Sequence, residues 1–278
     1  MGSLLKRIRG SRHFAADRFI PFEATSRVGW IRSDFVARLR RWPQVFAIGE
    51  RSVRLRPESV AARTAALAKV TQGLAEDGAI SGWRNENYAI RIPPQDEPLF
   101  HIERAAVRFF GLTSAAAHLN GFVRSGDGLR VWIARRSATK SIDPGLLDSL
   151  VGGGIPSGQD AWHALLRECH EEAGIEKALA AQATATGVLE VCHEVPEGLH
   201  SEILHAHDLE MPADFRPRNV DGEVSEFMLL NVAETADRIA SGEFTVEAGL
   251  VTLDFLVRWR AIAEPQVAAA LDRCRVRP

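Results

Sequence analysis

The chain has 278 residues, of which 46% are hydrophobic and 25% charged, and its formal net charge at pH 7 is -2. These proportions are typical of a globular protein with a full core, long enough for one large domain or two ordinary ones. The near-neutral charge argues against nucleic acid as a partner, because nucleic-acid-binding domains are usually basic. No apolar run approaches the roughly 20 residues that a membrane-spanning helix needs, so we expect no membrane partner.

The cysteines and the basic N-terminus bear on the compartment. The three cysteines are odd in number and show no paired spacing, which argues against a disulfide framework or a zinc site. A reducing compartment, and hence the cytoplasm, is expected. Before Asp17, the first acidic residue, the chain carries four basic ones: Lys6, Arg7, Arg9 and Arg12. A basic, Ser-containing start is also found in organellar targeting peptides, but we favour a short surface arm.

The first part of the chain mixes helical and strand-like patterns. An amphipathic stretch from Pro57 to Gly78 predicts a helix that ends at its glycine. The stretch from Gly82 to Ile92 ends in strand-like alternation, and Ile102 to Gly111 is predicted to be helical. The pattern changes near residue 115. We therefore expect a small α+β domain over residues 1–117.

From His118 onward the pattern predicts an α/β domain over residues 118–278. Two apolar stretches flank Ser125-Gly126-Asp127-Gly128, which indicates a β-hairpin. Strand-like segments follow at 186–195 and 223–232, and helical segments at 233–242 and 247–263. Strands with helices between and after them predict a sheet that is covered on both faces.

The stretch GGGIPSGQDAWHALLRECHEEAGI, residues 152–175, predicts a helix with two different sides. Ser157 is the expected N-cap, with an acid three residues later, and Gly174 is the expected C-terminal stop. The apolar side is formed by Trp162, Leu165, Leu166, Cys169 and Ala173. The opposite side carries three acids at i, i+3 and i+4: Glu168, Glu171 and Glu172.

The acidic side of this helix is unfavourable by itself. Like charges at these spacings cost about 0.2–0.5 kcal/mol per pair, and carboxylates near the C-terminus oppose the helix dipole. A divalent cation removes both penalties, and clustered carboxylates suit hard ions such as Mg²⁺ or Mn²⁺. For the three acids alone a solvated face is the favoured alternative. The preceding glycines at 152–154, which let backbone approach a ligand, and the adjacent Arg167 favour a metal site.

This spacing resembles the Nudix box, G-x5-E-x7-R-E-U-x-E-E-x-G-U, in which U is an aliphatic residue. Seven residues fall on the pattern: Gly153, Arg167, Glu168, Glu171, Glu172, Gly174 and Ile175. Cys169 stands at the first aliphatic position, and Gln159 stands where the first Glu belongs. In the family that Glu chiefly pairs with the box Arg, so Gln159 bears on helix geometry rather than on chemistry. The resemblance thus implies structural roles for Gln159, Arg167 and Gly174.

The resemblance implies a Nudix α/β/α sandwich with a mixed sheet and an enzyme that hydrolyses a diphosphate linkage by water attack on phosphorus. It implies Mg²⁺, or Mn²⁺, bound by the box glutamates and Gly153. Bound metal neutralises phosphate charge and activates the water, while a carboxylate acts as general base. The expected catalytic residues are Glu171 and Glu168, together with Glu223 from outside the box.

Residues outside the helix complete the expected site. Arg135, Arg136 and Lys140 close the predicted hairpin and could bind a diphosphate, with a solvated strand end as the alternative. The segment resembles the diphosphate-binding region of isopentenyl-diphosphate isomerases, which favours the binding role. Nudix enzymes often supply one more carboxylate from outside the box, as a metal ligand or base. Glu223 is the expected one, with two alternatives nearby, Glu226 and Asp221.

Segments beyond the box, among them GWRNENY, AAHLNGF and HDLEMPADFRP, resemble a Nudix subgroup with its own N-terminal domain of unknown function. This subgroup includes plant Nudix hydrolases and a fungal domain fused to thiamine pyrophosphokinase, and the resemblance covers nearly the whole chain. It implies hydrolysis of thiamine diphosphate, or its oxo and oxy analogues, to the monophosphate. We expect the N-terminal domain to cover the organic end of the substrate with groups such as Trp83, Arg84, Glu86, Tyr88, Arg104 and His118. Core positions for Trp83 and Tyr88, and a plain strand position for His118, are the favoured alternatives.

Other functions stay open at this point. They are an ADP-ribose or NADH pyrophosphatase, an isopentenyl-diphosphate isomerase, and a non-catalytic Nudix-fold binding module. The isomerase needs a catalytic Cys, and Cys169 lies on the apolar side of its helix. Gln159 favours the binding module, whereas the intact acidic triad argues against it. The sequence leaves open whether the chain is a monomer or a homodimer.

Overall fold

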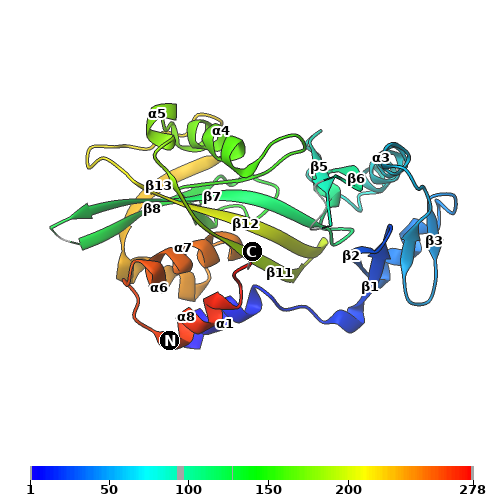
Figure 1. Cartoon of the computed structure of the whole chain (residues 1–278), viewed down its shortest axis with the longest axis horizontal. Helices are drawn as coiled ribbons and strands as arrows, with labels where there is room; N and C mark the ends of the chain where they lie inside the picture. Colours follow the sequence, from blue (N-terminus) through cyan, green and yellow to red (C-terminus); the bar gives the residue numbers. More distant parts are fainter. Residues whose placement is uncertain (1, 93–96, 127, 277–278) are drawn as a thin grey trace.

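The computed structural model describes residues 2–92, 97–126 and 128–276, and its largest element is a seven-stranded mixed sheet (Figure 1). Five strands follow in hydrogen-bonding order: β11 (Thr184–Val195), β12 (Gly198–Glu210), β7 (Thr113–Ser125), β8 (Gly128–Arg136) and β13 (Val224–Asn231). Two short strands complete it, β10 (Val151–Gly154) beside β7 and β9 (Leu147–Ser149) beside β8. β12 and β7 run parallel, and the other pairs are antiparallel.

Helices cover both faces of this sheet (Figure 1). One face carries α4 (Ala161–Ala173) and α5 (Lys177–Ala180). The other face carries α1 (Gly2–Gly10), α6 (Val232–Ser241), α7 (Val246–Arg258) and α8 (Pro265–Asp272). The predicted α/β sandwich is therefore confirmed. Within the described residues, no helix combines the length and apolar character needed to cross a membrane.

The N-terminal region folds around an aromatic core of its own. A four-stranded sheet has the order β2 (Arg27–Arg32), β1 (Phe19–Glu23), β4 (Val53–Leu55) and β3 (Phe46–Ile48). Beside it lie two short helical segments, Ser33–Phe35 and α2 (Val36–Leu39), the long helix α3 (Val60–Glu76), and the pair β5 (Asn87–Ile90) and β6 (Phe100–Glu103). Phe22, Phe46, Phe109 and Phe110 contact one another in the core, with ring centroids 5.0–6.2 Å apart.

Most of the elements expected from the sequence are present, and one is not. The predicted helix over Pro57–Gly78 is α3, and the predicted hairpin is β7–β8, with Ser125 opposite Gly128. Asp127, part of the predicted turn, lies outside the described residues. The helix predicted over Ile102–Gly111 is wrong, because only Arg104–Ala106 forms a 3-10 turn there. Ala106, Val107, Phe109 and Phe110 are buried in the core of the N-terminal region, so tertiary packing rather than helical periodicity determines this stretch.

The first helix of the chain packs against the far end of the sequence. Leu4 and Ile8 on α1 are buried in the same core as α6, α7 and α8. Lys6, Arg7 and Arg9 thus belong to a packed helix, and Arg12, beyond its end, pairs with Glu190 at 2.8 Å, so the expected surface arm is wrong. Strand β7 also starts at Thr113 and runs through the position where the sequence pattern changes. The two predicted domains are therefore joined in two ways. Strand β7 is continuous across the predicted boundary, and α1, from residues 1–117, packs in the core of residues 118–278.

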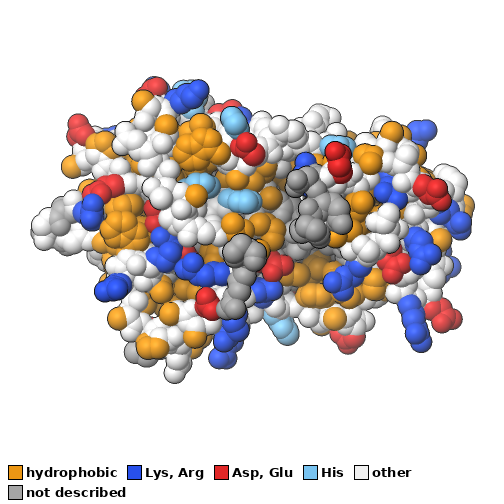
Figure 2. Space-filling model, in the orientation of Figure 1, with side chains coloured by type: hydrophobic (Ala, Val, Ile, Leu, Met, Phe, Trp, Pro, Cys, Tyr) orange, Lys and Arg blue, Asp and Glu red, His pale blue; other side chains and the backbone are white. Residues whose placement is uncertain are grey.

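The visible surface carries mixed charge. In Figure 2, basic and acidic side chains alternate over both halves of the molecule, with hydrophobic groups between them. Neither sign forms a continuous field on this face. This face therefore shows the mixed charge expected from the small net charge.

The packing of α1 generates the first testable prediction. Ile8 is 2% exposed, so Ile8→Ala should lower the free energy of unfolding by about 2–5 kcal/mol through loss of buried methyl groups and the cavity left behind. Chemical denaturation measures this loss. Arg9→Ala, on the exposed side of the same helix, is the matched control and should change stability by no more than about 0.5 kcal/mol. Equal stability of the two variants would show that α1 is not docked in solution.

Candidate active site

Helix α4 begins and ends with recognisable caps. Its N-cap is Asp160, whose carboxylate accepts a hydrogen bond from the backbone N–H of His163 at 2.8 Å. The expectation that Ser157 is the N-cap is therefore wrong, because the chain enters the helix three residues later. Gly174 is the C-cap, as predicted, with a left-handed φ of 63° that favours glycine. These caps define which way the glutamates of the last two turns face.

The glutamates of α4 turn toward the glycine strand β10. The carboxylate of Glu172 accepts a hydrogen bond of 2.9 Å from the backbone N–H of Gly152. A Cβ atom at Gly153 would lie 2.2 Å from the carboxylate of Glu168, so any side chain there would have to displace that carboxylate. Glu168 and Glu172 are 8% and 6% exposed, whereas the Glu171 side chain is 40% exposed. Two of the three acids are thus buried, not part of a solvated face.

Burial changes the acidity of these carboxyl groups. Burial, and then the charge of Glu168, raise the pKa of Glu172 to about 8. Burial also raises the pKa of Glu168, although Arg167 acts in the opposite direction. Arg167 contacts Glu168 at 2.7 Å and Glu171 at 2.8 Å. Without its usual partner at position 159, the box arginine therefore pairs with the helix glutamates themselves.

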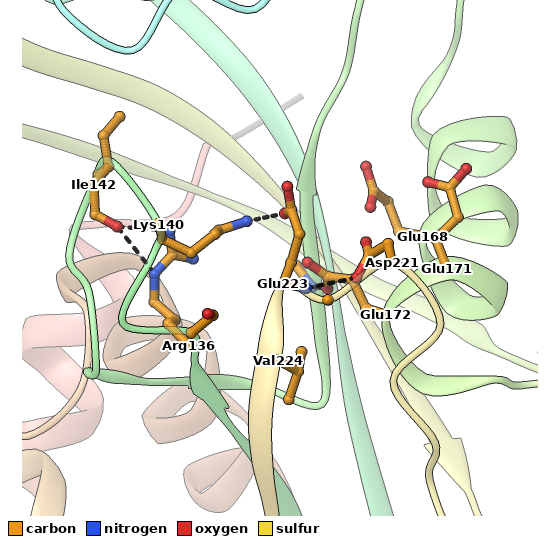
Figure 3. A network of polar contacts seen from close by, with 12 residues as sticks. Arg136, Lys140, Ile142, Glu168, Glu171, Glu172, Asp221, Glu223 and Val224 are labelled. Atoms are coloured by element: carbon orange, nitrogen blue, oxygen red, sulfur yellow. Dashed lines mark hydrogen bonds and ion pairs between the residues drawn. The ribbon is translucent and has the colours of Figure 1, made fainter.

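The donor set fits a hard divalent cation. Glu168, Glu171 and Glu172 offer carboxylate oxygens from one helix face, and Asp221 and Glu223 lie close to them in Figure 3. The backbone N–H of Asp221 donates to the carbonyl of Glu171 at 3.2 Å, which anchors this loop to the end of α4. Oxygen-rich clusters of this kind suit Mg²⁺ or Mn²⁺. A cation would also compensate two carboxylates that burial now destabilises as anions.

A basic group lies opposite these acids. Lys140 forms an ion pair with Glu223 (Figure 3). The Glu223 carboxylate also lies 3.4 Å from a guanidinium nitrogen of Arg84. Burial lowers the pKa of Lys140, while the charge of Glu172 raises it. Arg136 is tied to Asp148 at 2.7 Å and to the carbonyl of Ile142 at 2.8 Å. Sequence reasoning missed Asp148, because nothing in the sequence distinguishes this acid of the short strand β9 from other acids.

Three of the residues considered for the site lie outside this group of charged side chains: Arg135, Glu226 and Gln159. The guanidinium of Arg135 pairs with Glu226 at 2.9 Å across β8 and β13, and its side chain is absent from the lining of the cavity described below. Successive strand residues face opposite sides, so Arg136 and Arg135 cannot both face the same space. Gln159 is exposed, and its backbone N–H donates to the carbonyl of Pro156. The structure therefore brings together Arg136, Lys140, Glu223 and the box acids.

A cavity of about 140 Å³ starts at the glycine strand and runs along the boundary between the two halves of the chain. The box acids lie beside it, while Lys140, Arg136 and Asp148 line it. Residues of the N-terminal half form much of the opposite wall, among them Gly82, Arg84, Tyr88, Arg104 and Arg108. Its lining also includes His200, Glu202 and Glu247, which sequence reasoning missed because they come from β12 and the apolar helix α7.

Of the aromatic and histidine residues considered for substrate contact, two are buried and one is exposed. Tyr88 is buried, as favoured, and its ring packs over Gly154, where a Cβ would lie 1.7 Å from the phenol oxygen. Trp83 is 39% exposed, so the core position favoured for it is wrong; its indole N–H donates to Asn85 at 2.9 Å. His118 is a buried strand residue within 3.2 Å of the Ser149 hydroxyl, and it also lines the cavity.

The close approach at Gly153 generates the second prediction. Gly153→Ala should weaken Mg²⁺ binding, measured by calorimetry, because the added methyl group displaces the Glu168 carboxylate. We expect a loss of about tenfold or more in affinity, equivalent to about 1.4 kcal/mol. Gly10→Ala is the control, because no atom lies within 4 Å of a Cβ placed there. Unchanged Mg²⁺ affinity in Gly153→Ala would contradict this account of the glycine strand.

Comparison with known proteins places these features in context. Residues 3–114 match a domain of unknown function (DUF4743), and residues 117–248 match the NUDIX domain. The chain is 38% identical over 263 residues to Nudix hydrolase 24, chloroplastic, of Arabidopsis thaliana, covering 92% of this chain and 72% of that protein. It is 36% identical to Nudix hydrolase 20, chloroplastic, of the same plant, covering 95% and 73%.

A solved structure is also similar. The Ap4A hydrolase of C. elegans has a TM-score of 0.40 and 20% sequence identity. The similarity covers 54% of this chain and 99% of the nematode protein.

Proposed function

Because the chain belongs to the Nudix hydrolase family, and so is a diphosphate hydrolase, we propose that it cleaves thiamine diphosphate or its oxo and oxy analogues to the monophosphate with Mg²⁺. The observation that carries the catalytic part is the contact of two buried glutamates with the glycine strand beside a charged cavity. The thiamine part rests on the resemblance of the whole chain to its subgroup. Mn²⁺ is the alternative metal.

Each charged group has a role in this proposal. Glu168, Glu171 and Glu172 would hold Mg²⁺ together with the backbone of Gly153. Bound Mg²⁺ supplies charge neutralisation on the diphosphate and lowers the pKa of a water molecule. Lys140 leaves Glu223 and binds a phosphate oxygen, and Arg136 orients the loop that carries Lys140. Glu168, beside Gly153 at the edge of the cavity, accepts a proton from the attacking water, with Glu223 as the second candidate.

The N-terminal half contributes the part of the site that binds the organic end of the substrate. Arg84, Tyr88 and Arg104 line the cavity from one side while the glycine strand lines it from the other. Binding energy gained there, away from the reacting phosphorus, positions the diphosphate over the box. This arrangement supports a role for the half formed by residues 1–117 in choosing the substrate. Because α1 packs in the core of the other half, point variants test this role better than truncation.

A pyrophosphatase that acts on ADP-ribose or NADH is the alternative function, and release of AMP would identify it. Membership of the hydrolase family argues against the non-catalytic binding module that Gln159 favoured. The oligomeric state, monomer or homodimer, stays a prediction. Cytoplasmic location also stays a prediction, and two relatives carry the word chloroplastic in their names, which favours testing for organellar targeting.

Removal of one box carboxylate tests the catalytic proposal. Glu171→Gln should lower kcat by about 100-fold or more, the scale seen when a group that stabilises transition-state charge is removed. Its fold should be kept, because the side chain is part-exposed and its shape is unchanged. Glu226→Gln, an acid paired with Arg135 on the strand edge, should keep nearly full activity. Full activity of Glu171→Gln, or of wild type in excess chelator, would rule out the metal site.

A substrate screen tests the proposal that the substrate is a thiamine-type diphosphate. Purified protein with Mg²⁺ is given thiamine diphosphate, its oxo and oxy analogues, ADP-ribose, NADH and sugar nucleotides, and released products are separated and identified. We expect thiamine-type diphosphates to have the highest kcat/KM and to yield the monophosphate. A higher kcat/KM for ADP-ribose or NADH, with release of AMP, would replace the thiamine proposal by the pyrophosphatase alternative. No hydrolysis of any compound would favour the binding module.

A further inference from the structure

The hydroxyl group of Tyr88 lies against the glycine strand. Tyr88 is only 4% exposed, yet it lines the cavity together with Gly153 and Gly154. A Cβ atom at Gly154 would lie 1.7 Å from the phenol oxygen and 2.9 Å from Cζ, the ring carbon that carries it. The phenol oxygen therefore points at the backbone of β10, one residue from the glycine that faces the Glu168 carboxylate.

This hydroxyl group has no hydrogen-bonding partner among residues 2–92, 97–126 and 128–276. Three acids act on it by their charge, and each already has another partner: Glu202 the Ser114 hydroxyl at 2.9 Å, Glu168 the Arg167 guanidinium at 2.7 Å, and Glu86 the Arg104 guanidinium at 2.9 Å. A buried hydroxyl group is normally hydrogen-bonded, because an unsatisfied one is costly. Since this one faces the cavity, its acceptor has to be a molecule bound there.

The surrounding structure holds Tyr88 in this position before any ligand binds. The carbonyl of its neighbour Asn87 accepts a hydrogen bond of 2.8 Å from the backbone N–H of Ser157, three residues after Gly154. The guanidinium carbon of Arg104 lies over the Tyr88 ring, 5.7 Å from its centroid. The strand β5 is thus fastened to the loop between β10 and α4, and the phenol is placed beside the glycine strand.

The phenol is suited to donate a hydrogen bond to an anion. Burial raises the pKa of Tyr88 above its usual value, so the group stays protonated at neutral pH and can donate. Lys140 and Arg136 line the same cavity and supply positive charge. A neutral donor adds a directed hydrogen bond to an anionic oxygen without adding a further buried charge.

We propose that Tyr88 donates a hydrogen bond from its phenol to a phosphate oxygen of the substrate, so that the N-terminal half contacts the diphosphate as well as the organic end. The inference rests on the proposed function, because it assumes that the diphosphate binds beside the glycine strand and the box acids. It also accounts for Gly154, which leaves room for the phenol as Gly153 leaves room for the Glu168 carboxylate.

Tyr88→Phe tests this contact, because it removes the hydroxyl group and keeps the buried ring. Calorimetry measures binding of methylenediphosphonate, a diphosphate analogue that cannot be hydrolysed, in the presence of Mg²⁺. We expect Kd to rise about tenfold, the scale of one lost hydrogen bond to a charged group. The melting temperature should stay the same, since the hydroxyl group has no partner in the described part of the chain.

Thr71→Val is the matched control. It removes another fully buried hydroxyl group of the N-terminal half, one that donates to the carbonyl of Ala68 and does not line the cavity. This variant should bind methylenediphosphonate like wild type. An unchanged Kd in Tyr88→Phe, or no binding of the analogue to wild type, would overturn the proposal. A lowered melting temperature of Tyr88→Phe would overturn it in favour of a structural role, and weaker binding of thiamine alone would do so in favour of a contact with the organic end.

A second measurement separates this inference from the proposed function. The chain has one tyrosine, so protein labelled with ¹³Cζ-tyrosine gives a single resonance, which should shift when methylenediphosphonate is added to the Mg²⁺-containing sample. If the resonance shifts and Tyr88→Phe binds more weakly, yet no diphosphate is hydrolysed, the proposed function fails and the Tyr88 contact stands. If thiamine-type diphosphates are hydrolysed while the resonance and the Kd stay unchanged, the function stands and the contact is wrong.

Discussion

The contact between the glutamates of α4 and the glycines of β10 is the constraint on which the site depends. It requires a helix so close to a strand that a single Cβ at Gly153 would collide with Glu168. The strand is held on its other side by β7, and the helix by its caps at Asp160 and Gly174. Each partner is fixed by ordinary secondary structure, so the carboxylates remain buried although burial raises their pKa values. Buried carboxyl groups with raised pKa values are typical of functional sites.

The parts that could be predicted from the sequence are those with local causes. The helix period, the C-cap glycine and the hairpin all depend on residues a few positions apart, and the fixed spacing of the box identified Glu168, Glu171 and Glu172. Side-chain burial and pairing over long separations could not be predicted. Lys140 meets Glu223, 83 residues away, and His200 meets Glu247. The failed helix after Ile102 shows the limit of propensity, because tertiary packing around the Phe109 and Phe110 rings determines that stretch.

The two halves of the chain share one cavity, and this shapes how substrate choice can arise. The C-terminal half supplies the glycine strand, Lys140, Arg136, His200, Glu202 and Glu247 to its lining, while the N-terminal half supplies Arg84, Tyr88 and Arg104. Because α1 returns to pack under the sheet and β7 runs through the junction, the halves cannot separate without losing core contacts. A cavity between elements held this way is largely pre-formed, so little ordering of the protein accompanies binding.

The ion pair between Lys140 and Glu223 links binding of the diphosphate to the state of the metal site. In the structure these two groups neutralise each other, and the Lys140 side chain is only 10% exposed. Leaving Lys140 buried and unpaired is unfavourable, so it should leave Glu223 only when it gains a new partner, which a diphosphate oxygen provides. Glu223 is 31% exposed and keeps Arg84 at 3.4 Å, and a divalent cation would be a further partner for it. The two ligands then favour each other's binding, since the diphosphate draws Lys140 away from the carboxylate that the cation would contact.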